Sequence, residues 1–134
     1  MNDAVSISLD GHRRTYQPGE ILSGEYRIER MLAVEPSAVE LSVLWHTEGQ
    51  GDEDLAVHHF ERWSREQDEP ADFRRPRRFQ TCLPNSPLSY QGVIVKIRWC
   101  VRVRVFLPRG KPLLAEQPFQ LGSLTAASAA LPVE

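Results

Sequence analysis

The sequence has few cysteines, no long apolar run and no excess of charge of one sign. Its two cysteines among 134 residues are too few for a disulfide scaffold. No run approaches the roughly 18 apolar residues of a membrane-spanning helix, and the first residues lack the layout of a signal peptide. A net charge of −2 argues against a dedicated nucleic-acid-binding protein. These absences predict a cytoplasmic chain that binds no nucleic acid and does not insert into a membrane.

The chain also lacks the motifs that mark most enzymes and metal sites. It has no Gly-x-Ser-x-Gly elbow, no glycine-rich phosphate loop and no recognisable pair of catalytic carboxylates. No histidine or cysteine spacing suits zinc, and His58 and His59 would point to opposite faces of a strand. We therefore expect no catalysis, no cofactor and no metal. Cys82 and Cys100 are expected to be free thiols, as is usual in the cytoplasm.

What the sequence does have is apolar residues at every second position, in stretches separated by Gly and Pro. Such stretches cover residues 5–9, 39–45 and 93–106. Residues 21–31, 55–63 and 114–121 are further predicted strands. The longest, 93–106, places apolar side chains on one face from Val93 to Val105, and its length predicts a bulge or bend. Gly24 is expected to mark a bulge or a close approach of two strands.

No stretch predicts an amphipathic helix longer than two turns. Short strands with Gly and Pro between them indicate an all-β fold, an antiparallel β-sandwich. We expect one domain over residues 1–122 and a C-terminal tail over 123–134. Trp45 and Trp99 are expected in the core, whereas Trp63 borders a charged loop.

Several segments, taken in order, resemble the arrestin-like superfamily. They are 16–20 (Tyr-Gln-Pro-Gly-Glu) with 24–26 (Gly-Glu-Tyr), 79–84 (Phe-Gln-Thr-Cys-Leu-Pro) with 87–92 (Pro-Leu-Ser-Tyr-Gln-Gly), 97–103 (Ile-Arg-Trp-Cys-Val-Arg-Val), and 118–119 (Pro-Phe). The order and spacing of these segments carry the resemblance, which spans about residues 4–122. The Pro-Gly pair sets a turn, Leu83-Pro84 ends a strand, and Ser89 is expected to close a local side-chain turn.

The resemblance implies an immunoglobulin-like or arrestin-like β-sandwich of about seven or eight strands. It also implies a class of function. Members of this superfamily are mostly adaptors and scaffolds that bind other proteins, such as receptors and cargo tails, and are not enzymes. Eukaryotic arrestins and the arrestin-like retromer subunit carry two sandwiches in tandem, whereas this chain has one and looks more like a stand-alone bacterial relative. The matched positions are residues of the fold, so the resemblance transfers no binding residue.

The densest basic run comprises Arg74, Arg75, Arg77 and Arg78 and follows an acidic stretch at 66–72. Arginine binds carboxylates and phosphates through two parallel hydrogen bonds, so this run could dock an acidic or phosphorylated tail. Two other interpretations stay open. The run could lie in a loop where opposite charges neutralise each other, or it could contact nucleic acid without sequence preference.

A second basic cluster lies on one face of the longest predicted strand. It consists of Lys96, Arg98, Arg102 and Arg104. Side by side, these charges could attract an acidic partner. The alternative is a solvent-facing strand whose cations pair with acidic residues on neighbouring strands, such as Glu40 or Glu25.

The sequence therefore predicts a non-enzymatic protein–protein interaction module, an adaptor of uncharacterised pathway. A partner could add a strand to an exposed sheet edge or dock an acidic segment on the arginines, and a homo-oligomer could form through an edge strand. The first alternative is a module that binds a small ligand or carbohydrate, which would need exposed Trp63 and Tyr90. The second is a hydrolase of unrecognised type.

Overall fold

The computed structural model describes residues 4–29, 34–51, 53–64, 75–122 and 124–125. Its strands are β1 (Val5–Leu9), β2 (Thr15–Tyr16), β3 (Ile21–Ile28), β4 (Ala38–Gly49), β5 (Leu55–Ser64), β6 (Arg77–Cys82), β7 (Tyr90–Gln91), β8 (Val95–Phe106), β9 (Leu113–Leu121) and β10 (Leu124–Thr125). A single 3-10 turn, η1 (Asp10–His12), follows β1 within the described residues. Seven of these strands have five or more residues, in agreement with the predicted number.

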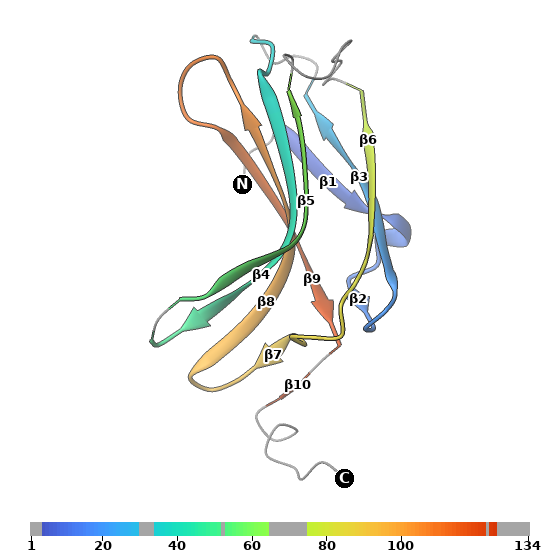
Figure 1. Ribbon diagram of the computed structural model, residues 1–134, viewed down its shortest axis with the longest axis vertical. Helices are drawn as coiled ribbons and strands as arrows, with labels where there is room; N and C mark the ends of the chain where they lie inside the picture. Colours follow the sequence, from blue (N-terminus) through green and yellow to red (C-terminus); the bar gives the residue numbers. More distant parts are fainter. Residues whose placement is uncertain (1–3, 30–33, 52, 65–74, 123, 126–134) are drawn as a thin grey trace.

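The strands form two sheets that face each other (Figure 1). The small sheet has the order β1-β3-β6, and the large sheet has the order β10-β7-β8-β4-β5, with β9 also paired to β8 and β2 to β9. All pairs between the long strands are antiparallel, which confirms the predicted fold class. The two-residue pairs β2–β9 and β7–β10 are parallel, an addition that the alternating pattern did not indicate.

The core fills the space between the two sheets with every second residue of the long strands. The large sheet contributes Val39, Leu41 and Val43 from β4 and a row from Trp99 to Val105 in β8. The small sheet contributes residues such as Leu22, Tyr26 and Phe79. Trp99 is in the core as predicted. Trp45 and Trp63 are partly exposed and pack against this core.

The structure refines two details of the longest predicted strand. Val93 and Ile94 precede β8 in a turn and are exposed, so Val93 is not part of the inward row. Of the expected bulge or bend, β8 has no bulge, because its pairing with β4 runs from Val95 to Phe106 without a shift, but the strand is curved (Figure 1). The shift lies between β4 and β5, at Val43/Leu44, because β5 carries one extra residue there.

The segments that resemble the arrestin-like superfamily meet in space and hold the fold. The Gly19 N–H donates to the Leu83 carbonyl over 3.1 Å, and the Leu83 N–H donates to the Glu20 carbonyl over 2.9 Å. Ser89 does not close the local side-chain turn that the sequence predicted. Its buried Oγ accepts from the Leu121 N–H over 2.9 Å, so it ties the loop before β7 to the end of β9.

Candidate interaction surface

The outer face of the large sheet, which points away from the core, has an apolar centre. Leu44 of β4 and Cys100 of β8 are cross-strand partners on this face. They lie outside the core cluster, yet only 1% of Leu44 and 3% of Cys100 is exposed, because neighbouring side chains cover them. Burial, with a contribution from the Glu116 charge, raises the pKa of the Cys100 thiol to about 12, so this thiol is protonated and unreactive at neutral pH.

Strand β5 adds an exposed apolar row beside these two residues. Leu55, Val57 and Phe60 are 53%, 49% and 51% exposed. Their partners in β4 are His46, Leu44 and Ser42, so all three side chains lie on the outer face. We refer to Leu55, Val57 and Phe60 together as the apolar patch; Leu44 and Cys100 lie on the same face but are buried.

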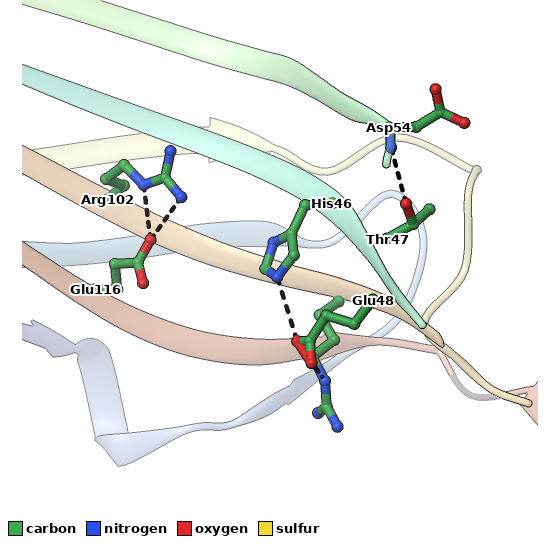
Figure 2. Close-up of polar contacts among 7 residues, drawn as sticks. His46, Thr47, Glu48, Asp54, Arg102 and Glu116 are labelled. Carbon is green, nitrogen blue, oxygen red and sulfur yellow. Dashed lines mark hydrogen bonds and ion pairs between the residues drawn. The ribbon is translucent and has the colours of Figure 1, made fainter. Parts of the chain in front are cut away.

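Paired polar and charged side chains lie beside the apolar patch, on β4, β8 and β9. An oxygen of Glu116 lies 2.7 Å from the Arg102 guanidinium, and an oxygen of Glu48 lies 3.3 Å from Nε2 of His46 (Figure 2). The same Glu48 oxygen is 3.0 Å from Nε of Arg98. These pairs are partly exposed, so each contributes at most about 1 kcal/mol to stability. Together these pairs form a polar rim next to the apolar patch.

Two of the four cations in the predicted basic cluster on β8 are therefore neutralised. Lys96, Arg98, Arg102 and Arg104 do share the outer face, but Arg98 and Arg102 are ion-paired with Glu48 and Glu116. The acidic partners named from the sequence were wrong: Glu40 pairs with Arg62, and Glu25 pairs with Arg27. Lys96 and Arg104 form no ion pair with any residue in the described part of the chain.

The arginine run does not form one basic patch in the described residues. Arg74 lies outside them, and Arg75 precedes β6. Arg77 and Arg78 are consecutive in β6 and point to opposite faces. Arg77 stacks over the Trp63 ring, with its guanidinium carbon 4.9 Å from the ring centroid. Both side chains thus hold the fold together.

Arg78 lies on the outer face of the small sheet and binds Asp10. Nη1 of Arg78 donates to an Asp10 oxygen over 2.8 Å, and the Ser23 hydroxyl donates to the other oxygen over 2.8 Å. These hydrogen bonds lower the pKa of Asp10 from 3.8 to about 2. The two predicted basic clusters therefore lie on different sheets, because β6 belongs to the small sheet and β8 to the large one.

On one side of the sandwich, side chains bridge the edge strands β5 and β6. Nε2 of His58 in β5 lies 2.8 Å from the Cys82 carbonyl in β6, and the Trp63 ring of β5 packs against the Arg77 guanidinium of β6. His59 is 2.7 Å from Glu61, whose partner in β4 is the core residue Leu41. An edge strand with a bulge and inward-pointing polar groups resists pairing with another strand.

The bulge also corrects the argument that His58 and His59 face opposite ways. His58 is the extra residue of β5, and its ring approaches the core residue Trp99 with centroids 6.2 Å apart. His59 pairs with Val43, another core residue. The two rings thus lie on the same side of β5 but contact different acceptors. No group of three metal-ligating side chains occurs among the residues that the structure describes.

The features required for a ligand-binding module are weak in this structure. Tyr90 is half-buried and lines a cleft of ≈ 110 Å³ between β7, β8 and β9. Ligand pockets are typically about 300 Å³ or larger.

Cys82 and Cys100 are free thiols, as predicted. In the described residues, no helix is sufficiently long and apolar to cross a bilayer.

Comparison with known proteins shows the fold. No protein-family model matches the chain, and no curated protein matches its sequence. Spo0M, a sporulation control protein from Bacillus subtilis, has a similar structure, with a TM-score of 0.56 and 14% identity over 87% of this chain and 48% of Spo0M. This chain thus spans about half the length of Spo0M.

A second solved structure is similar over most of its length. It is the superoxide reductase (neelaredoxin) from Ignicoccus hospitalis, with a TM-score of 0.52 and 8% identity over 89% of this chain and 80% of that protein. Identities this low carry no information on activity. Together with the two sheets described above, these similarities show that the chain folds as a β-sandwich of the arrestin-like type.

Proposed function

We propose that the chain is a cytoplasmic, non-enzymatic protein-interaction module that binds its partner through the outer face of the large sheet. The observation that carries this proposal is the apolar patch with its rim of ion pairs. Protein interfaces have this composition, an apolar centre with a polar surround. Covering the three exposed side chains of β5 would contribute roughly 25 cal/mol for each Å² of apolar surface removed from water.

The face is a better candidate than the sheet edge or the arginine run. The bulge and the His59–Glu61 pair protect the edge of β5. Arg77 and Arg78 are engaged by Trp63 and Asp10. Reversing these two charges would therefore disturb the fold as well as any binding. The exposed apolar residues on β5 have no such structural engagement and are free to contact a partner.

The test compares two lysine substitutions at equally exposed apolar positions. Phe60→Lys places a charge in the apolar patch, whereas Ile21→Lys places one on the outer face of the small sheet, where Ile21 is 52% exposed. Each tagged variant is cross-linked and captured from the source cell. We expect a specific partner to be lost with Phe60→Lys and retained with Ile21→Lys. Equal retention in both variants would overturn the proposal.

A further inference from the structure

We infer that the partner covers the outer face of the large sheet with an amphipathic α-helix, whose apolar stripe lies on β5 and whose acidic flank faces β8. This inference rests on the proposed function, because it names the kind of segment that the same surface binds. The charge of the face, the positions of two cations and the irregular edge of β5 favour this partner over the alternatives.

The outer face of the large sheet is positively charged, although the whole chain carries a net charge of −2. The register of β4, β5, β8 and β9 places five basic and three acidic side chains on this face, with histidine counted as neutral. They are Arg62, Lys96, Arg98, Arg102 and Arg104 against Glu40, Glu48 and Glu116. The resulting charge of +2 attracts an acidic segment and repels a basic one or a second copy of the same face.

Two of these cations are available to a partner. The three carboxylates of the face are each ion-paired with one of the other three arginines, whereas Lys96 and Arg104 form no ion pair within the described part of the chain. Along β8 these two cations are separated by eight residues, which corresponds to about 26 Å. The apolar patch lies between them in the strand direction, because it is level with residues 98–102 of β8.

An α-helix laid along the strands fits these positions. Strand β4 separates β5 from β8, so the apolar patch and the two cations are about 10 Å apart across the sheet. An α-helix with its side chains is about 10–12 Å wide and rises about 1.5 Å per residue. A helix of about 18 residues over β4 therefore covers the apolar patch with one flank and reaches both Lys96 and Arg104 with the other.

A helix suits a sheet face because its backbone hydrogen bonds are made within the segment itself. An extended segment would need a free strand edge to pair its N–H and C=O groups. The free edge of β5 is irregular at the His58 bulge, and His59 and Glu61 lie on its inner side. Contact with the outer face is therefore made through side chains alone, as in domains where helices pack on sheets.

An anionic membrane is a poorer match for the same charges. Only two cations of this face are unpaired among the described residues, whereas basic clusters that bind anionic lipids carry about four to eight. A flat lipid surface would also press its phosphates against the three carboxylates of the face. A helix can instead place single acidic residues beside the two unpaired cations.

Binding of a synthetic helix to the purified full chain tests the inference. The probe is a fluorescein-labelled peptide of about 20 residues with leucines at helical spacing and glutamates along one flank. Its matched control has lysine in place of every glutamate. We expect fluorescence anisotropy to show saturable binding of the acidic peptide alone, and this binding should weaken as salt rises from about 50 to about 300 mM.

Variants of the chain locate the binding site. Lys96→Glu combined with Arg104→Glu should weaken binding of the acidic peptide at least about 10-fold, and Phe60→Lys should do the same. The control combines Arg109→Glu with Lys111→Glu, which reverses two exposed charges in the loop between β8 and β9. Its affinity should stay within about three-fold of the wild type. Circular dichroism confirms that each variant is folded.

The inference is overturned by equal binding of both peptides, or by no binding of the acidic peptide up to about 500 μM. Wild-type affinity in the charge-reversed β8 variant overturns it as well. Binding to vesicles of phosphatidylcholine and phosphatidylserine, without binding to the peptide, would replace the helix by a membrane. The capture experiment separates these failures from failure of the proposed function. A captured partner that Phe60→Lys still removes overturns only the helix, whereas a chain that captures nothing overturns both.

Discussion

Tyr26 has a buried hydroxyl that forms no hydrogen bond with the described residues. Its side chain is 1% exposed, and burial raises its pKa above the ordinary value of 10.0. The opposite residue in β6 is Arg77, whose Nε is also buried and unpartnered in the described part of the chain. A buried polar group without a partner loses its hydration and gains no hydrogen bond in return.

Tyr26→Phe should therefore leave the protein as stable as the wild type or stabilise it by about 1 kcal/mol. The substitution removes the unpaired hydroxyl and keeps the ring that packs against Trp63. Urea denaturation of both proteins measures the difference. A loss of more than about 1 kcal/mol would show that the hydroxyl is satisfied in the folded protein.

Asp10 makes the stability of the small sheet dependent on pH. Its folded-state pKa is lowered from 3.8 to about 2 by hydrogen bonds from Arg78 and Ser23. A group with a lowered folded-state pKa stabilises the fold above its unfolded pKa and loses that contribution as the pH falls through its folded pKa. The contribution of Asp10 is therefore complete above about pH 4 and disappears as the pH approaches 2.

Asp10→Asn should make the midpoint of thermal unfolding fall less between pH 4.5 and pH 2.5 than it does in the wild type, since the titrating group is removed. Arg78→Ala should have a similar effect because it removes the principal donor. Identical pH profiles for the wild type and Asp10→Asn would contradict this role. Glu40→Gln is a suitable control, because Glu40 is ion-paired with Arg62 on the other sheet.

At the scale of the elements, alternation predicted the inward row of β8 and the shared outer face of Lys96, Arg98, Arg102 and Arg104. The ion-pair partners could not be predicted, because a partner depends on strand order and register. Glu116 reaches Arg102 only because β9 pairs with β8 in the register that places them opposite each other. Nothing in the local sequence of either strand encodes that register.

The sequence did not predict the exposed row of Leu55, Val57 and Phe60 on β5, for a different physical reason. Val57 and Phe60 are three residues apart, and a regular strand would place them on opposite faces. The extra residue at His58 brings both onto the outer face. A bulge is a property of the pair of strands, so the sequence of β5 gives no period-two signal for this row.

Gly24 was expected to mark a close approach, and the structure confirms it. A Cβ at this position would lie 2.4 Å from the Ser8 carbonyl oxygen and 3.0 Å from the Phe79 ring. Gly24→Ala should therefore push β1 away from β3 and cost about 1–3 kcal/mol of stability.

Hydrogen exchange gives the more specific measurement of this effect. Amides of β1 should lose protection in Gly24→Ala, because β1 pairs only with β3 in the small sheet. Gly110→Ala is the control, since a Cβ there meets no atom within 4 Å. Gly110→Ala should lower the stability only through the left-handed backbone conformation at this position. The amides of β1 should therefore stay protected from exchange. Unchanged protection of β1 in Gly24→Ala would contradict the close approach.

At the scale of the whole molecule, the two sheets expose different outer faces. The small sheet presents polar and ion-paired side chains such as Asp10, Arg78, Arg27 and Glu25. The large sheet presents the apolar patch with its rim. The sequence predicted the sandwich because alternation survives in most of the long strands, among them β4 and β8. It could not show this asymmetry, which arises only when β4, β5 and β8 are placed side by side.

The central claim is that the outer face of the large sheet is the surface through which this protein binds. Photo-cross-linking from a benzophenone amino acid tests it most directly, with the group at position 60 in one variant and at position 21 in another. Irradiation in the source cell should yield a discrete adduct from position 60 and none from position 21. No adduct from position 60, or the same adducts from both positions, would contradict the claim.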